Sequence, residues 1–147
     1  MLEGLNENMI QLDVEAADFN DAIEKAAKPL KDAGMITDHY VEEIIAGVKQ
    51  YGPYIVLAPH IALAHAAPEA GAKETGVAIA SLKEPVVSGN EANDPVKYII
   101  AMSAISGEKH MELISELSEL LSDQAFYELL ETSADPNEIA VYLRENY

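Results

Sequence analysis

Four short apolar runs in the middle of the chain constrain its fold more than any other feature. They are YIVLAP, IALAH, GVAIASL and VKYIIAMSA, which lie between Tyr54 and Ala104 among prolines, glycines and polar residues. Runs of this length and composition are typical of largely buried strands. A buried sheet needs helices packed against it, and the segments on either side of these runs have the apolar spacing of helices.

The N-terminal segment predicts a strand followed by a helix. MIQLDV, residues 9–14, alternates apolar and polar side chains as a strand does. Residues 18–34 predict a helix with Asp18 or Asn20 as its N-cap. Pro29 lies inside this stretch and lacks a backbone N–H, so we expect it to kink or shorten the helix.

Further helices are expected after this one and in the C-terminal third. Thr37 is the candidate N-cap of a helix over residues 37–52, and Asp135 is the candidate cap of the last helix. The apolar face of the helix at 37–52 consists of Val41, Ile44, Ile45 and Val48. The C-terminal third shows helical spacing over three stretches, residues 108–121, 122–133 and 135–147.

The order of elements is therefore one strand, two helices, about four strands and three helices. This order predicts an α/β fold (α+β-like), in which a central mixed β-sheet of about five strands is covered by helices on both faces. The chain has 147 residues with no repeat, linker or low-complexity segment. A single domain over residues 1–147 is expected.

Composition excludes several classes of function. The formal net charge is −17, which repels nucleic acid and anionic membrane surfaces. The chain has no cysteine, so thiol catalysis and thiolate metal sites are excluded. No apolar stretch is long enough to span a membrane, and the first residues do not resemble a secretory signal. A soluble, cytoplasmic protein is expected.

Two of the four histidines, His60 and His65, lie five residues apart in the apolar middle of the chain. On a helix they would point about 140° apart, and on a straight strand they would lie on opposite faces. This spacing disfavours a shared metal ion, and a metal-dependent hydrolase would require bound zinc. His65 ends an apolar run, where a rigid strand presents a side chain to a cleft. The alternative for His65 is a core histidine whose ring nitrogens bond the backbone.

The other two histidines lie near predicted helix starts. His110 falls in the first turn of a helix that begins at Ser106 or Gly107, and helix N-termini bind phosphate through free N–H groups. The alternative for His110 is an exposed polar residue. His39 has no apolar neighbours and is expected on the surface. The chain has neither a glycine-rich phosphate loop nor a serine in a nucleophile elbow.

Two long segments carry a resemblance to a known family. They are GPYIVLAPHIALAHAAPEAGAKETGVAIASLKEPV and NDPVKYIIAMSAISGEKHMELISELSELLSD. Together they resemble the EIIA proteins of the phosphoenolpyruvate-dependent sugar phosphotransferase system, in the mannitol/fructose-type superfamily and closest to its L-ascorbate branch. On this resemblance the phosphorylated histidine is His65, and a second functional histidine is His110. Further residues that match the branch are Pro68, Glu69, Thr75, Gly76 and Asn93-Asp94-Pro95.

The resemblance implies a phosphoryl carrier that works without a cofactor or metal. The donor would be the phosphocarrier protein HPr, charged from phosphoenolpyruvate through Enzyme I. The acceptor would be a cysteine of a cognate EIIB, coupled to the membrane transporter EIIC, during uptake of a carbohydrate such as L-ascorbate. Nε2 of His65 would carry the phosphate, and His110 would stabilise the phosphoryl oxygens. The alternative is a regulatory EIIA-like binding module in which phosphorylation of His65 is a signal.

The sequence departs from the branch at four positions near the expected site. Ala64, Ala66 and Ala67 stand where the branch has Pro, Gly and Arg, and His60 stands where it has Gly. The absent Arg would have contacted phosphate, because a guanidinium binds phosphate through two parallel hydrogen bonds. One hypothesis is that this contact is missing here, and another is that His60 supplies it. His60, Glu69 and Thr75 are therefore expected as possible neighbours of the site.

Overall fold

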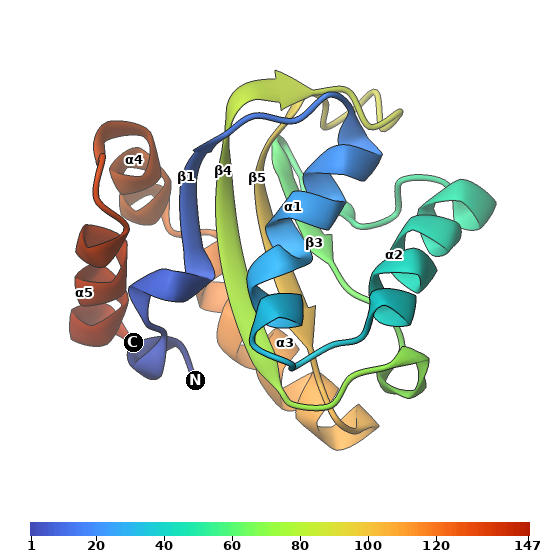
Figure 1. The fold of residues 1–147 in the computed structure, drawn as a ribbon. Coiled ribbons are helices and arrows are strands. Elements are labelled where there is room, and N and C mark those ends of the chain that lie inside the picture. The colour runs from blue at the N-terminus through green and yellow to red at the C-terminus, as the bar shows by residue number, and fades with distance from the viewer.

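A five-stranded mixed sheet runs through the middle of the computed structural model, which describes residues 1–147 (Figure 1). The strand order is β1-β4-β5-β3-β2. β1 pairs parallel with β4 and β3 pairs parallel with β5, whereas β4–β5 and β2–β3 are antiparallel. The strands are β1 Ile10–Val14, β2 Val56–Ala58, β3 Ile61–Ala64, β4 Gly76–Val86 and β5 Val96–Ser103.

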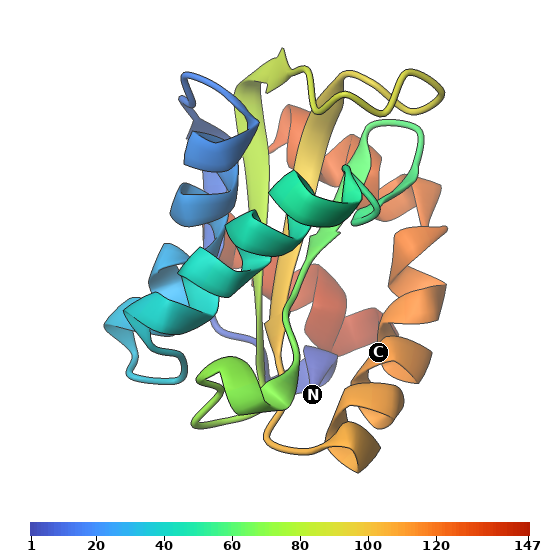
Figure 2. The same ribbon diagram turned by 90° about the vertical axis from the view of Figure 1, so that its right-hand side faces the viewer.

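Helices cover both faces of the sheet, as Figures 1 and 2 show. α1 (Phe19–Asp32) and α2 (Asp38–Tyr51) pack on one face. α3 (Gly107–Leu121), α4 (Gln124–Thr132) and α5 (Pro136–Asn146) pack on the other. The predicted fold class and order of elements are thus confirmed. None of the helices combines the length and the apolar character that crossing a membrane requires.

Four details of the elements differ from the sequence-based expectation. β4 continues to Val86, beyond the apolar run that ends at Leu82; exposed Lys83, Glu84 and Pro85 interrupt the apolar pattern before the buried Val86. The other three details are short 3₁₀ turns, η1 Leu2–Gly4, η2 Glu7–Met9 and η3 Pro68–Ala70. The turn η3 lies between β3 and β4, within the apolar middle of the chain.

The side chains of the buried strands pack alternately into two separate cores, one on each face of the sheet. The residues of β3, β4 and β5 that face α1 and α2 are mostly small, whereas those that face α3, α4 and α5 are large. Successive side chains of a strand point to opposite faces, so one apolar run fills both cores. The small set is Ala62, Ala64, Ala78, Ala80 and Ala101, and the large set is Leu63, Val77, Ile79, Ile100 and Met102.

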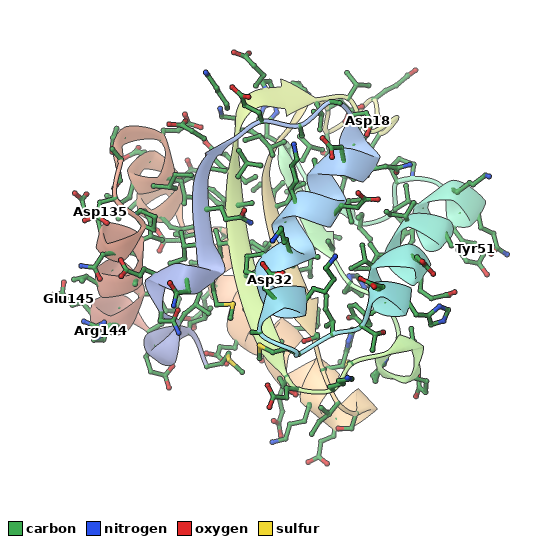
Figure 3. The ribbon with its side chains drawn as sticks, viewed as in Figure 1. Asp18, Asp32, Tyr51, Asp135, Arg144 and Glu145 are labelled. Carbon is green, nitrogen blue, oxygen red and sulfur yellow. The ribbon has the colours of Figure 1, made fainter.

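The residues predicted as N-caps form side-chain hydrogen bonds to backbone N–H groups in the first turns of their helices. The Asp18 carboxylate accepts from the N–H of Asp21 at 2.8 Å, and the Asp135 carboxylate accepts from the N–H of Asn137 at 2.9 Å. Figure 3 shows Asp18 at the start of α1 and Asp135 at the start of α5. Each cap satisfies an N–H that has no partner inside its helix, and this explains why these boundaries could be read locally.

Pro29 does not shorten α1, although shortening is one of the two effects expected from the sequence. The helix continues to Asp32, and Figure 3 shows Asp32 at its far end. A proline at position 29 leaves the carbonyl of Lys25 without its helical N–H partner. Nε2 of Gln11, on the neighbouring β1, donates to that carbonyl at 2.8 Å. A long-range side chain therefore satisfies the group that the proline frees.

We predict that the Gln11 hydrogen bond matters because of Pro29. In the wild type, Gln11→Met should lower the free energy of unfolding by about 1–3 kcal/mol, since the Lys25 carbonyl loses its partner. In a Pro29→Ala background the restored backbone N–H at position 29 can bond that carbonyl, so the same change should cost less than about 1 kcal/mol. Urea unfolding followed by circular dichroism measures the four variants. Equal costs in both backgrounds would contradict this account.

Candidate functional site

His65 and His110 meet at one edge of the sheet because β3 and β5 run parallel. Ala64, the last residue of β3, pairs with Ala101 near the end of β5. His65 follows β3 directly, and α3 begins shortly after β5. The ring centroids of His65 and His110 lie 5.5 Å apart, with the ring planes tilted by 52°. Side chains that follow parallel strands gather at the carboxyl edge of a sheet, where ligands bind in α/β folds.

The two histidines line one open pocket of about 460 Å³. Its lining contains no Lys, Arg, Asp or Glu, although the chain has a net charge of −17. The rim includes exposed apolar surface, since Tyr54 is 47% and Met111 is 65% exposed. The complete lining is Tyr54, His65, Ala66, Ala67, Pro68, Gly107, His110 and Met111.

The backbone sets the tautomer of His65. Its Nδ1 lies 2.8 Å from the carbonyl oxygen of Leu63. A carbonyl only accepts, so Nδ1 must carry the proton and Nε2 keeps its lone pair. Nε2 makes no hydrogen bond within the chain and is not among the buried unpaired atoms, so it is open to the pocket. His65 therefore presents an unprotonated nitrogen to whatever enters.

The surroundings of His65 keep its ring neutral. Burial of the ring is the main effect and lowers its pKa below the usual value of 6.5. The hydrogen bond to Leu63 works against this lowering, and the nearby His110 adds to it. A neutral imidazole with a free Nε2 is a nucleophile at neutral pH.

The start of α3 contributes backbone donors beside His110. Ser106 caps the helix by accepting from the N–H of Lys109 at 3.2 Å, and the N–H of His110 donates to the carbonyl of Ser106 at 2.9 Å. The N–H groups of Gly107 and Glu108 have no acceptor in the chain. Gly107 lines the pocket, so the positive end of the α3 dipole faces it.

Tyr54 also lines the pocket, and no pattern in the sequence pointed to it. Its ring meets the ring of His65 edge-on, at a centroid distance of 6.2 Å and an angle of 81°. Gly47 on α2 makes room for it, because a Cβ there would lie 3.1 Å from the Tyr54 hydroxyl. Tyr51, 72% exposed at the end of α2 (Figure 3), packs edge-on against Tyr54 at a centroid distance of 6.5 Å. Only the return of the chain after α2 brings the Tyr54 ring beside His65.

The structure places the other residues expected near the site as follows. Ala66 and Ala67 line the pocket. Glu69 lies exposed on η3 and Thr75 lies outside the pocket, so neither lines it. The hydroxyl of Thr75 accepts from the N–H of Ile105 at 3.3 Å and so ties β4 to the loop before α3. His39 is exposed at the start of α2, as expected.

His60 does not lie beside His65, which corrects the expectation that it borders the site. It precedes β3 whereas His65 follows it, so the four residues of β3 separate the two histidines. Its Nδ1 instead donates to the carbonyl of Pro95 at 2.7 Å. The backbone of His60 has φ of 71°, a left-handed conformation that glycine adopts most easily. This explains why the resembling branch has glycine here.

Residues 3–146 match the family model described as the phosphoenolpyruvate-dependent sugar phosphotransferase system, EIIA 2. The chain belongs to this family. This EIIA is 35% identical over 133 residues to the ascorbate-specific PTS system EIIA component of Salmonella choleraesuis, and the match covers 90% of this chain and 86% of the relative. It is thus a phosphotransfer component of a sugar phosphotransferase system.

Two solved structures have the same fold as this EIIA. The mannitol-specific cryptic phosphotransferase enzyme IIA of Escherichia coli matches with a TM-score of 0.88 and 30% identity, covering 99% of this chain and 100% of that one. The mannitol enzyme IIA of Escherichia coli, solved in complex with phosphorylated enzyme IIB, matches with a TM-score of 0.79 and 26% identity. That match covers 97% of this chain and 98% of the other.

We predict that His65 makes the stability of this EIIA depend on pH near neutrality. The folded pKa of His65 lies below its unfolded value, so the unfolded chain takes up the proton first. As pH falls through about 6.5, stability is lost, and the loss from this residue ends below the folded pKa. The free energy of unfolding between about pH 8 and pH 5 should therefore decline less in His65→Gln than in the wild type. Parallel curves for the two proteins would contradict this.

Proposed function

We propose that Nε2 of His65 carries a phosphoryl group, accepted from phosphorylated HPr and passed to a cysteine of a cognate EIIB. One observation carries the proposal: the Leu63 carbonyl holds the proton on Nδ1, which leaves the lone pair of Nε2 facing an open pocket beside His110. This is the tautomer that a phosphoryl acceptor needs, and the backbone holds it in place without any titratable partner.

Each transfer exchanges one bond to phosphorus for another. In the first, the Nε2 lone pair attacks phosphorus while the bond between phosphorus and the donor breaks, and the donor leaves with that electron pair. The imidazole gains positive charge, which the Leu63 carbonyl stabilises through the Nδ1–H bond. In the second, a cysteine thiolate attacks phosphorus, the N–P bond breaks, and Nε2 regains its lone pair. Positioning and charge stabilisation dominate such transfers.

The start of α3 supplies the groups that stabilise the phosphoryl oxygens. The His110 ring lies 5.5 Å from the His65 ring, and the free N–H groups of Gly107 and Glu108 lie in the same turn. Preorganised donors of this kind stabilise developing negative charge. The apolar rim at Tyr54 and Met111 supports docking of a protein that closes the pocket and excludes water.

The relatives support the identity of the partners. The ascorbate-specific EIIA of Salmonella choleraesuis supports a carbohydrate of the L-ascorbate kind, and the mannitol enzyme IIA solved with phosphorylated enzyme IIB supports a cognate EIIB. Enzyme I would charge HPr from phosphoenolpyruvate, and the EIIB would serve a membrane EIIC. The proposal places this EIIA in the cytoplasm, with no nucleic acid partner and no insertion into the membrane.

Labelling with Enzyme I, HPr and radioactive phosphoenolpyruvate tests the proposal. Label should enter at His65, be labile in acid and stable in base, and disappear in His65→Ala. His110→Ala should still take up label but about 10–1000-fold more slowly, because one stabilising donor is lost. His39→Ala, at an exposed site, is the matched control and should label normally. Label that persists in His65→Ala would contradict the proposal.

A second prediction concerns Ala67, which lines the pocket where the branch has Arg. No cationic side chain lines the pocket, so Ala67→Arg should speed phosphorylation of His65 or stabilise the phosphorylated state. A charge-assisted hydrogen bond contributes roughly 1.5–3 kcal/mol, and exposure reduces this to an effect of several-fold. His60→Gly should leave the rate unchanged, because His60 lies at the far end of β3.

Stopped-flow or rapid-quench measurements on both single variants and the double variant distinguish the two hypotheses about the absent Arg. An impaired His60→Gly would show that His60 supplies the contact after all. If neither variant changes the rate, the substitution at Ala67 has no part in transfer.

A further inference from the structure

One buried hydroxyl joins the backbone segments that carry the two histidines. Tyr40, in the first turn of α2, is 1% exposed. Its hydroxyl accepts from the N–H of Ala66 at 3.1 Å and lies 2.9 Å from the carbonyl oxygen of Met102, to which it donates. The carbonyl of Ala66 is a second acceptor within reach, at 3.2 Å. Ala66 directly follows His65, and Met102 lies near the end of β5 just before the loop to α3.

The hydroxyl bonds occur where the sheet stops holding these segments together. The last pair between β3 and β5 is Ala64 with Ala101. His65 must leave the sheet to face the pocket, so the backbone after it has no strand partner. The Tyr40 hydroxyl fills this gap one step beyond the ladder by linking Ala66 to Met102. The position of His65 relative to β5 therefore depends on a side chain from α2.

The start of α2 positions both Tyr40 and Gly71, which ends the loop that begins at His65. The hydroxyl of Thr37 caps the helix by accepting from the N–H of Tyr40 at 3.2 Å, and the N–H of Thr37 donates to the carbonyl of Gly71 at 3.1 Å. Gly71 has φ of 131°, and a Cβ there would lie 2.1 Å from the Thr37 hydroxyl oxygen. The loop from His65 to Gly71 is thus fixed at both ends by one helix terminus.

The environment keeps the Tyr40 hydroxyl protonated, as its two roles require. A phenol can donate one hydrogen bond and accept others, whereas a phenolate only accepts. Burial is the main influence and raises the pKa of Tyr40 above its usual value, while the bond to Ala66 works in the opposite direction. The hydroxyl therefore stays protonated near neutral pH and can donate to Met102.

We infer that Tyr40 is a positioning residue for phosphoryl transfer. Its hydroxyl fixes the position of His65 relative to His110, and it thereby maintains the Nδ1–H tautomer of His65. This inference rests on the proposed function. Tyr40 does not touch the pocket, so it acts through the backbone of Ala66 and not on the phosphoryl group. Without the hydroxyl, the chain after His65 can move, and the Nδ1 bond to Leu63 loses its fixed geometry.

Tyr40→Phe is the direct test, because it keeps the buried ring and removes only the oxygen. Tyr127→Phe is the matched control. Tyr127 is also buried, at 6% exposure, and its hydroxyl donates to the carbonyl of Leu121 at 2.9 Å in the core on the other face of the sheet. Both variants lose a buried hydroxyl and should lose a similar amount of stability. Only Tyr40→Phe leaves backbone groups beside His65 without a partner.

Two measurements are made on folded protein, as judged by circular dichroism. Tyr40→Phe should lower kcat for phosphoryl transfer from phosphorylated HPr about 10- to 100-fold. KM should change little, since the position of His65 changes and the docking surface does not. In ¹⁵N NMR the wild-type His65 should show only the Nδ1–H tautomer, and Tyr40→Phe should show a mixture. Tyr127→Phe should match the wild type within about twofold in kcat and in the His65 spectrum.

If Tyr40→Phe behaves like Tyr127→Phe in both measurements, the inference is wrong. If the wild type takes up no phosphate, the proposed function fails, and the tautomer spectrum still decides the role of Tyr40. If Tyr40→Phe does not fold, Thr37→Val replaces it as the test. This change removes the cap beneath Tyr40 and should slow transfer in the same direction but less, and an unchanged rate and spectrum would overturn the inference.

Discussion

The parallel pairing of β3 with β5 is the constraint on which the rest of the site depends. Because the two strands run the same way, His65 and the start of α3 emerge at the same edge of the sheet. β4 runs antiparallel to β5 and begins at that edge too, so Thr75 reaches the loop before α3. An antiparallel β3 would place His65 and His110 at opposite ends of the sheet, whatever the local sequence around each histidine.

The candidate site is an uncharged pocket in a strongly acidic protein, and under the proposed function this contrast bears on how a phosphoryl group would reach it. The net charge of −17 repels free anions, and the pocket lining has no cationic side chain to hold one. These features favour delivery by a protein that docks on the apolar rim over delivery by a diffusing phosphate compound. Neutral donors from the start of α3 also hold a phosphoryl group less tightly than arginines would, which suits a carrier that must give the group away.

Sequence patterns predicted most of the fold because most of its boundaries rest on local interactions. Asp18, Thr37, Ser106 and Asp135 each cap a helix through a bond to a residue two or three positions away. The apolar runs locate β3, β4 and β5 because these strands are buried on both faces over most of their length. Pro29 shows the limit of such reasoning. Proline normally breaks a helix, but here the Lys25 carbonyl that it leaves unpaired accepts a hydrogen bond from Gln11 on β1.

The sequence by itself determined the elements, their order, and His65 and His110 as the candidate pair, through periodicity, capping residues and a family resemblance. Only the tertiary structure decided that these two rings lie 5.5 Å apart, that His60 is excluded from the site, and that Tyr54 and Tyr40 belong to its surroundings. The physical reason is the range of the contacts. Capping and periodicity act within a few residues. The strand order and the Tyr40 hydrogen bonds instead join segments that are distant in the chain, so no local pattern in the sequence reveals them.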